Sequence, residues 1–188
     1  MSFANITLSG TVISVTQEDK SYKALFQPDL KDAPAIIVNA YGNLGERLKS
    51  LSGYQAVITG KALHTDSKSI FNLELSECYL SGDYGEPKAI AVIIGRYSTK
   101  YAKTKKVGNQ ECYEFQVSYP CGKADGKTQY FNWSVASFGK NAENIQKWFE
   151  DGKTIGLTTE IKWYAKDSDH LYLNATVIGW NFVGGKGE

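Results

Sequence analysis

The sequence has little of what most enzymes and metalloproteins need. Its 188 residues include two histidines, three cysteines and one methionine. Cys78, Cys112 and Cys121 follow no CxxC or Cys/His spacing, which argues against a zinc site. His64 and His170 stand beside no Ser or Cys motif, and no Gly-rich segment matches a phosphate-binding fingerprint. The sequence therefore predicts a protein that is not an enzyme and that uses no cofactor or metal.

Long apolar runs are also missing. No N-terminal stretch has the length of a signal peptide, and no later stretch has the length of a membrane span. Three unpatterned cysteines are typical of reduced thiols inside a cell. We therefore expect a cytoplasmic protein with no membrane partner.

Charge of one sign does not dominate, since the formal net charge is +1. The balance differs between the halves, however: residues 1–83 carry 7 Lys/Arg against 9 Asp/Glu, and residues 84–188 carry 14 against 11. Aromatic residues, by contrast, are plentiful at 13%. Small β-barrels fill their cores with such rings, and rings left on the surface can stack on planar ligands. The second half is therefore better suited to meet a polyanion.

The chain contains an internal repeat. Residues 129–143 alternate along a strand, end it in an aromatic, turn at a glycine and start a short helix, and residues 35–46 have the same layout. Tyr41-Gly42-Asn43 then aligns with Phe138-Gly139-Lys140, and Glu46 aligns with Glu143. A period of about 97 residues in a chain of 188 predicts two copies of one small domain.

Each copy has the pattern of five strands with one helix between the third and the fourth. In the first copy Ile6, Leu8 and Val12 share one face of the opening strand, and in the second copy Tyr113 and Phe115 point inward. We expect strands over 5–16, 22–27, 36–41, 56–64 and 71–80, then over 89–98, 110–119, 129–138, 154–164 and 171–182, with helices over 43–52 and 141–149, a basic hairpin tip over 100–108 and a Gly-rich loop over 120–127. This is the element order of the OB-fold, a five-stranded Greek-key barrel.

The fold prediction is therefore a mainly β chain of two tandem OB-fold barrels, each with one short helix between strands three and four. The first domain is expected over 1–82, a linker over 83–88, the second domain over 89–183 and a short C-terminal tail over 184–188. A pair of SH3-like barrels is the alternative, but such barrels usually lack a helix at this position.

These stretches resemble a known family. Residues 133–143, WSVASFGKNAE, are similar to a motif of the bacterial and phage single-stranded DNA-binding proteins, and so are NITLSG at 5–10, GKAL at 60–63 and IAVIIGR at 90–96. The first copy departs from the motif at Tyr41 and Asn43, and the second has Thr-Glu where a glycine is expected. The sequence ends in VGGKGE, unlike the acidic tail with which family members recruit replication proteins.

The resemblance implies several expectations. Single-stranded DNA is the partner, inside a bacterial cell or a phage-infected host. Replication or recombination proteins are further partners. Family barrels often assemble four to a complex, which a two-barrel chain would reach as a homodimer.

The strongest candidate for a DNA contact is a basic cluster within residues 96–106. Its eleven residues contain no acid. Single-strand binding needs cations for the phosphates and aromatic faces for the bases. A solubilising hairpin tip is the alternative interpretation. The cluster consists of Arg96, Lys100, Lys103, Lys105 and Lys106, with Tyr97 and Tyr101 interleaved.

Phe138 and Tyr41 end the third strands of the two copies at matching places. Both are in phase with the polar, outward residues of their strands, so stacking on bases is favoured over packing under the helix. The family resemblance implies the same role for Phe138. Lys140 and Lys61 follow the glycines of the family motifs and complete this set of candidates.

The end of the fourth strand in the second copy supplies further candidates. Of Trp163 and Tyr164, one is expected to face the binding groove, with Lys162 beside them. Trp133 is in phase with core residues, so burial is favoured over a DNA contact. Trp148, on the second helix, is expected to pack against the barrel.

The sequence thus predicts a sequence-tolerant single-stranded DNA-binding protein that protects or organises DNA in replication, recombination or repair. Most of the affinity is expected in the second barrel. One alternative is an OB-fold accessory factor that binds proteins of a replication or recombination complex. The other is an RNA-binding OB module.

Overall fold

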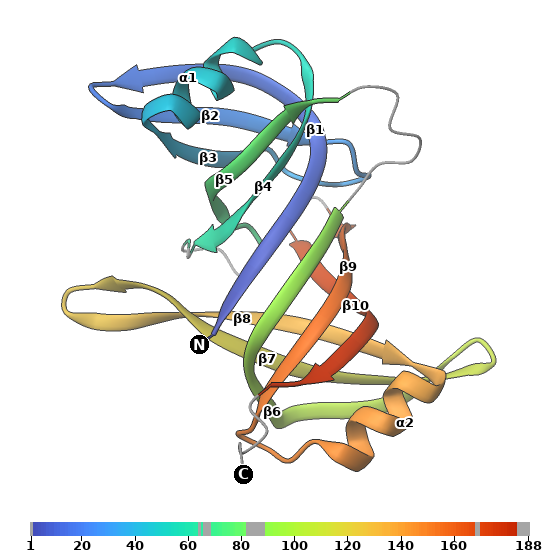
Figure 1. Cartoon of the computed structure of the whole chain (residues 1–188). Coiled ribbons are helices and arrows are strands. Elements are labelled where there is room, and N and C mark those ends of the chain that lie inside the picture. The colour runs from blue at the N-terminus through green and yellow to red at the C-terminus, as the bar shows by residue number, and fades with distance from the viewer. Residues whose placement is uncertain (1, 64, 66–68, 82–88, 168–169, 184–188) are drawn as a thin grey trace. The chain divides into compact units, whose positions relative to one another are not determined.

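A computed structural model describes residues 2–63, 65, 69–81, 89–167 and 170–183 (Figure 1). The chain divides into two compact units. The N-terminal unit comprises Asn5–Ile90 and Lys162–Tyr172, and the C-terminal unit comprises Met1–Ala4, Ala91–Ile161 and Leu173–Glu188. The predicted linker at 83–88 and the predicted tail at 184–188 lie outside the described residues.

The N-terminal unit is built on a closed ring of strands. The pairing order is β2-β3-β5-β4-β1, and β1 also pairs with β2. β3 and β5 run parallel, whereas the other pairs run antiparallel. The ring has an apolar interior because alternate residues of its first strand, Ile6, Leu8 and Val12, are completely buried. The elements are β1 (Phe3–Glu18), β2 (Ser21–Pro28), β3 (Ile36–Tyr41), α1 (Gly42–Ser50), β4 (Gln55–Leu63) and β5 (Asn72–Leu80).

The C-terminal unit repeats this order. Its strands pair as β6-β7-β8-β10-β9, and β6 also pairs with β9. Phe115, Val117 and Trp133 point inward, at exposures of 2%, 0% and 1%. Burial of Trp133 confirms the core position predicted for it. The elements are β6 (Ala89–Val107), β7 (Gln110–Ala124), β8 (Lys127–Phe138), α2 (Gly139–Trp148), β9 (Thr154–Asp167) and β10 (His170–Phe182).

The junction between third strand and helix is the same in both units. Gly42 and Gly139 follow the strands with φ of +53° and +54°, a left-handed conformation that costs glycine little and other residues about 1–2 kcal/mol. The helices end near Gly53 and Gly152, whose φ values are +84° and +81°. The predictions of a mainly β chain and of one helix after each third strand are confirmed. Within the described residues, no helix has the length and apolar character needed to span a membrane.

Two hairpins of the C-terminal unit are much longer than predicted. β6 and β7 remain paired out to Val107 and Gln110. β7 and β8 remain paired through Ala124↔Lys127, so the prediction of a Gly-rich loop over 120–127 is wrong. Asp125 and Gly126 turn the second hairpin with φ of +50° and +74°, as a type I′ turn requires. The hairpins extend to opposite sides of the unit, β7–β8 to the left and β6–β7 to the right of Figure 1.

The outer part of the β9–β10 hairpin belongs to the core of the N-terminal unit. Trp163 is 3% exposed, its Nε1–H donates to the Ser69 carbonyl at 2.8 Å, and its ring lies 5.7 Å from that of Phe71. The Ser69 hydroxyl in turn donates to the Leu171 carbonyl. Trp163 therefore has no open ring face for a nucleobase, which corrects the prediction that it could face the groove.

Candidate nucleic-acid interface

The outward face of β6, β7 and β8 is a polar surface in the C-terminal unit. The side chains of these strands alternate between the core and this face, and those on this face are exposed or half-buried, apart from Cys112 and Ala136 near the end of β8. One row across the three strands places Arg96 beside Ser118 and Asn132, and the next places Ser98 beside Gln116 and Ser134. We call these six residues the polar face. Its hydroxyl and amide groups can bond phosphate, sugar or base edges, and the Arg96 guanidinium adds a donor with a positive charge.

The β6–β7 hairpin carries three lysines beside the polar face. Glu114 of β7 lies 3.0 Å from the Lys103 Nζ and 2.5 Å from the Lys105 Nζ. Burial opposes ionisation of Glu114, but the hydrogen bonds from Lys105 and Lys103 outweigh it and hold the pKa of this carboxyl below its usual range. Lys106 pairs in register with Glu111. The positive charge of the acid-free run over 96–106 is therefore partly compensated in the folded unit, because β7 supplies the acids.

A bulge in β6 presents the most exposed aromatic ring of this region. The register moves from Ser98↔Gln116 to Lys103↔Glu114, so residues 99–102 stand opposite a single residue of β7. Tyr101, within the bulge, is 61% exposed, and the Lys100 Nζ lies 5.2 Å from the centre of its ring. A bulge re-aims side chains away from the regular face of a strand. Here it displays a ring and a cation together, as stacking on a nucleic acid requires.

The bulge is anchored to the turn between α2 and β9. The backbone N–H and the hydroxyl of Thr99 both donate to Asp151 Oδ1, at 2.6 and 3.0 Å. The hydrogen bond from the Thr99 backbone, then that from its hydroxyl and the charge of Arg96, lower the pKa of Asp151 below its usual range. Tyr101 is thus displayed from a fixed position.

The β7–β8 hairpin carries candidates that the sequence analysis did not identify. Lys123 and Lys127 are exposed near its tip, and Tyr130 is 55% exposed farther down β8. The sequence pattern places these residues in a loop and at a strand end. The signal that could have found them is the Asp125-Gly126 pair between alternating residues, which is typical of a two-residue hairpin turn.

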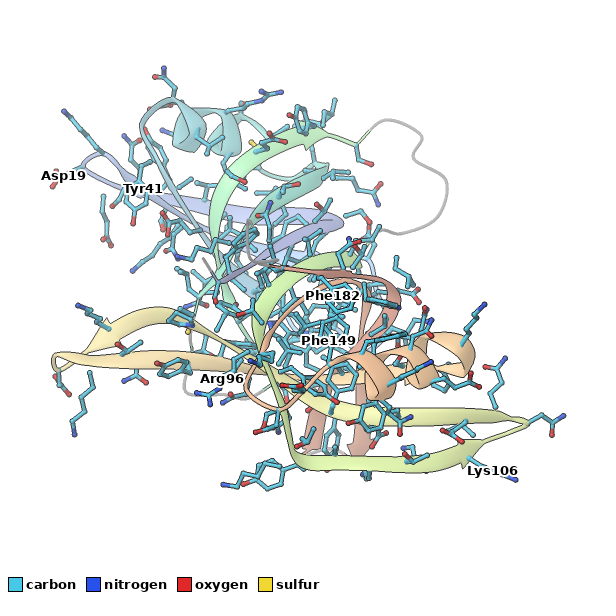
Figure 2. The ribbon with its side chains drawn as sticks, turned by 60° about the horizontal axis from the view of Figure 1, so that its bottom comes forward. Asp19, Tyr41, Arg96, Lys106, Phe149 and Phe182 are labelled. Carbon is cyan, nitrogen blue, oxygen red and sulfur yellow. The ribbon has the colours of Figure 1, made fainter. Side chains whose placement is uncertain are left out.

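The two aromatics at the strand–helix junctions differ in exposure. Phe138 is half-buried at the end of β8, in register with Cys112, and Lys140 is exposed in the first turn of α2. Tyr41, at the matching place in the N-terminal unit, is 61% exposed. It lies beside the β1–β2 turn, where Asp19 is also seen in Figure 2.

Two interpretations of aromatic residues are corrected by burial. Tyr97 is 1% exposed, and its hydroxyl lies 2.6 Å from that of Tyr113. Burial is the main cause that raises the pKa of Tyr97, and the ring cannot reach a base. Trp148, expected to pack, is instead 54% exposed, because helix α2 buries its Ala142 and Ile145 side.

The remaining candidates lie in the N-terminal unit. Tyr164 and Tyr172 stack on each other at 5.3 Å with an interplanar angle of 15°, and both are exposed. Lys162 is exposed next to this pair, and Lys61 is exposed on β4. The C-terminal unit thus gathers most of the predicted set, namely Arg96, Lys100, Tyr101, Lys103, Lys105, Lys106, Phe138 and Lys140.

The thiols and acids form no metal centre in the described part of the chain. Cys78, Cys112 and Cys121 are buried thiols that are not joined in disulfides. No group of three or more His, Cys, Asp or Glu residues among those described is arranged to hold a metal ion. Burial is the leading cause that raises the pKa of Cys78 and of Cys112. These cysteines therefore behave as small core residues.

Comparison by sequence finds no relatives. No protein-family model matches the chain. No curated protein matches it either.

Comparison by structure finds the same fold across the whole chain. A deletion mutant of the single-stranded DNA binding protein from Thermus aquaticus matches with a TM-score of 0.66 and 8% identity, covering 100% of this chain and 97% of that one. The wild-type protein matches with a TM-score of 0.64 and 9% identity, covering 100% and 96%. The second single-stranded DNA binding protein of Mycobacterium smegmatis matches over 53% of this chain and 96% of that one, with a TM-score of 0.38 and 14% identity. The chain therefore has the fold of the Thermus aquaticus protein, which confirms the family resemblance at the level of fold.

Proposed function

We propose that this protein binds single-stranded DNA with little sequence preference, through two OB-fold barrels of which the C-terminal one carries most of the affinity. The observation that carries this proposal is the polar face of β6, β7 and β8, flanked by two lysine-bearing hairpins and by the exposed ring of Tyr101. The second and third strands of an OB barrel are where such folds bind oligonucleotides. The shared fold supports the proposal, because the Thermus aquaticus protein is a single-stranded DNA binding protein.

The chemistry of this surface suits a single strand better than a duplex. Tyr101 and Tyr130 are 61% and 55% exposed, so their faces are open to unstacked bases. Bases inside a duplex offer no such faces, whereas each base stacked from a single strand contributes about 1–3 kcal/mol. Lys103, Lys105 and Lys106 supply charge for the phosphates. Every base has a face that can stack on such a ring, so sequence-tolerant binding follows.

We propose a different role for the N-terminal unit. Its outward face is more apolar: Ile13 is 47% exposed and Ile37 is 37% exposed, and Leu25 pairs in register with Ile37. An exposed apolar patch on a small unit favours contact with protein. We therefore propose that this face forms a homodimer that brings four barrels together, which the mass in solution tests. Replication or recombination proteins remain proposed partners, and a role in replication, recombination or repair is proposed with them.

The test is a titration with oligonucleotides of matched length. Oligo-dT and oligo-dA are expected to bind with similar affinity, to raise the fluorescence anisotropy of a labelled oligonucleotide, and to bind less tightly as salt rises, by about 0.7 log-log units per phosphate contacted. Duplex DNA of the same length is expected to bind much more weakly. If oligo-dT changes neither fluorescence nor mobility at low salt, the proposal is wrong.

Two outcomes of that titration would replace the proposal with another function. Tighter binding of oligo-rU than of oligo-dT would assign the surface to RNA, which is recognised through its 2′-hydroxyls. If neither binds, a pull-down from host lysate with and without nuclease tests whether the chain is instead an accessory factor that binds proteins directly.

A further inference from the structure

A cavity of about 640 Å³ opens between α2, β9 and the end of β10 in the C-terminal unit. Its aromatic lining consists of Trp148, Phe149 and Phe182, and Glu150 and Lys153 also line it. The volume lies within the range of about 300–1,000 Å³ typical of ligand sites. None of these residues belongs to the polar face.

The aromatic walls of the cavity are held in place by one another. Phe149 is 8% exposed and stacks on Phe182 at 4.9 Å. Trp180 stands nearly perpendicular to both rings, at 5.5 and 5.6 Å. Phe182 nonetheless remains 61% exposed, and Trp148 is 54% exposed. Rings that are already ordered bind a planar group at a low cost in side-chain entropy.

Arg96 of the polar face lies against the turn that borders the cavity. The turn that carries Glu150 and Lys153 is hydrogen-bonded to β6: the Tyr97 N–H donates to the Lys153 carbonyl, and the Gly152 N–H donates to the Tyr97 carbonyl, each at 2.9 Å. A Cβ placed on Gly152 would come within 3.1 Å of an Arg96 Nη atom, so the guanidinium lies against this turn.

The charges around the cavity favour an anionic ligand with planar rings. The Lys147 Nζ lies 4.6 Å from the centre of the Trp148 ring, and Lys153 lines the cavity. Two acids lie nearby. Asp151 accepts hydrogen bonds from the backbone N–H and the hydroxyl of Thr99, and the Glu150 Oε2 lies 3.9 Å from the Lys153 Nζ. Arg96, Lys147 and Lys153 thus place cations around an aromatic site, which is the combination that single-stranded nucleic acid requires.

We propose that the cavity of α2, β9 and β10 is a second subsite for the same DNA strand, in which a nucleobase stacks on Phe182 and Trp148 after the backbone has passed Arg96. This inference rests on the proposed function. It implies that the strand leaves the polar face and bends round the α2–β9 turn. A short oligonucleotide fills only the polar face, whereas a longer one reaches both sites.

The experiment compares two lengths of oligo-dT on the wild type and on Phe182→Ala. Lengths of about 6 and about 30 nucleotides bracket the site sizes of OB-folds. We expect the substitution to weaken binding of the long oligonucleotide about 5- to 150-fold, the loss of one stacked base, and to leave the short one unchanged. Ile178→Ala is the matched control, because Ile178 lies on the same strand at 55% exposure and does not line the cavity.

A second measurement uses the fluorescence of the wild-type protein and needs no substitution at a ring that packs on the core. Trp148 is the most exposed of the four tryptophans, so the long oligonucleotide should quench its emission and the short one should not. The quenching component should vanish in Trp148→Phe.

The outcomes separate the two proposals. If neither oligonucleotide binds the wild type, the proposed function itself fails. The other outcome is that both oligonucleotides bind, that Phe182→Ala changes neither affinity, and that Trp148 is not quenched. In that case the cavity lies off the path of the strand. The second subsite is then overturned while the proposed function stands, and the cavity is left as a site for an apolar side chain of a partner protein.

Discussion

Glu114→Gln is the substitution that tests the electrostatics of the proposed interface most sharply. Glu114 pairs with Lys103 at 3.0 Å and with Lys105 at 2.5 Å, so its carboxylate competes with any phosphate for both lysines. Glutamine keeps the size and a hydrogen-bonding group but removes the charge. We therefore expect the variant to bind oligo-dT more tightly than the wild type does.

The size of this effect follows from distance and screening. A carboxylate about 6 Å from a phosphate repels it by about 0.7 kcal/mol at the dielectric constant of water, which corresponds to roughly threefold in affinity. Two phosphates at that distance would give roughly tenfold at low salt, and less near physiological salt because the Debye length there is about 8 Å. If both lysines turn to phosphates, the slope of log affinity against log salt should steepen by up to about 1.4. Loss of two surface ion pairs should cost the fold no more than about 1–2 kcal/mol.

The pH dependence of binding gives an independent check on Glu114. The pKa of Glu114 lies below its usual range in the folded protein. The ion pairs therefore stabilise the fold at pH values above the usual pKa range of a glutamate, and this stabilisation is lost as the pH falls through the folded pKa. As Glu114 is protonated, the wild type should gain affinity for oligo-dT, whereas Glu114→Gln should show no gain from this source.

The assay is a fluorescence anisotropy titration across salt and pH. Glu74→Gln, an exposed acid on β5 with the same change in net charge, is the control. Equal affinities and equal slopes for Glu114→Gln and the wild type would refute the proposed role of this hairpin.

Three further predictions concern rings and turns. Tyr101→Ala should weaken binding of oligo-dT about 5- to 150-fold without changing the melting temperature, whereas Tyr54→Ala, at 60% exposure in the other unit, should leave affinity unchanged. Trp163→Ala should lower the free energy of unfolding by about 3–5 kcal/mol in urea titrations, because the ring is buried against Phe71; an unchanged stability would contradict its place in the core. Gly139→Ala should lower the free energy of unfolding by about 1–2 kcal/mol, because φ at this position is +54°. Gly122 also has open space around its Cα but is not at positive φ, so Gly122→Ala should lower the free energy of unfolding less. Equal losses of stability in the two variants would contradict the left-handed junction.

Local patterns in the sequence predict much of the fold. The alternation of Ile6, Leu8 and Val12 identifies an inward face, and the aligned glycines at 42 and 139 identify both strand–helix junctions. Such signals are local, because side-chain period and positive φ depend on a few neighbouring residues. The hairpin lengths are harder to predict, because an Asp-Gly pair fits the middle of a loop as well as a type I′ turn between two long strands.

The candidate site is less predictable because it depends on pairing between strands. Glu114 neutralises lysines that are far from any acid along their own strand, and only the register of β6 and β7 brings them together. The same holds for Trp163, whose partners at Ser69 and Phe71 are more than ninety residues away in the sequence. Packing is expected for Trp148 because tryptophan is usually buried, but α2 places it on the open side of the helix beside the cavity.

The salt dependence of oligo-dT binding by a triple variant decides whether the C-terminal unit binds single-stranded DNA through this face. Lys103→Gln, Lys105→Gln and Lys106→Gln together remove three charges from the β6–β7 hairpin without adding any of the opposite sign. We expect weaker binding and a slope of log affinity against log salt that is shallower by up to about 2, at about 0.7 for each phosphate that the variant no longer neutralises. A variant that binds as tightly as the wild type, with the same slope, would show that the strand does not bind there.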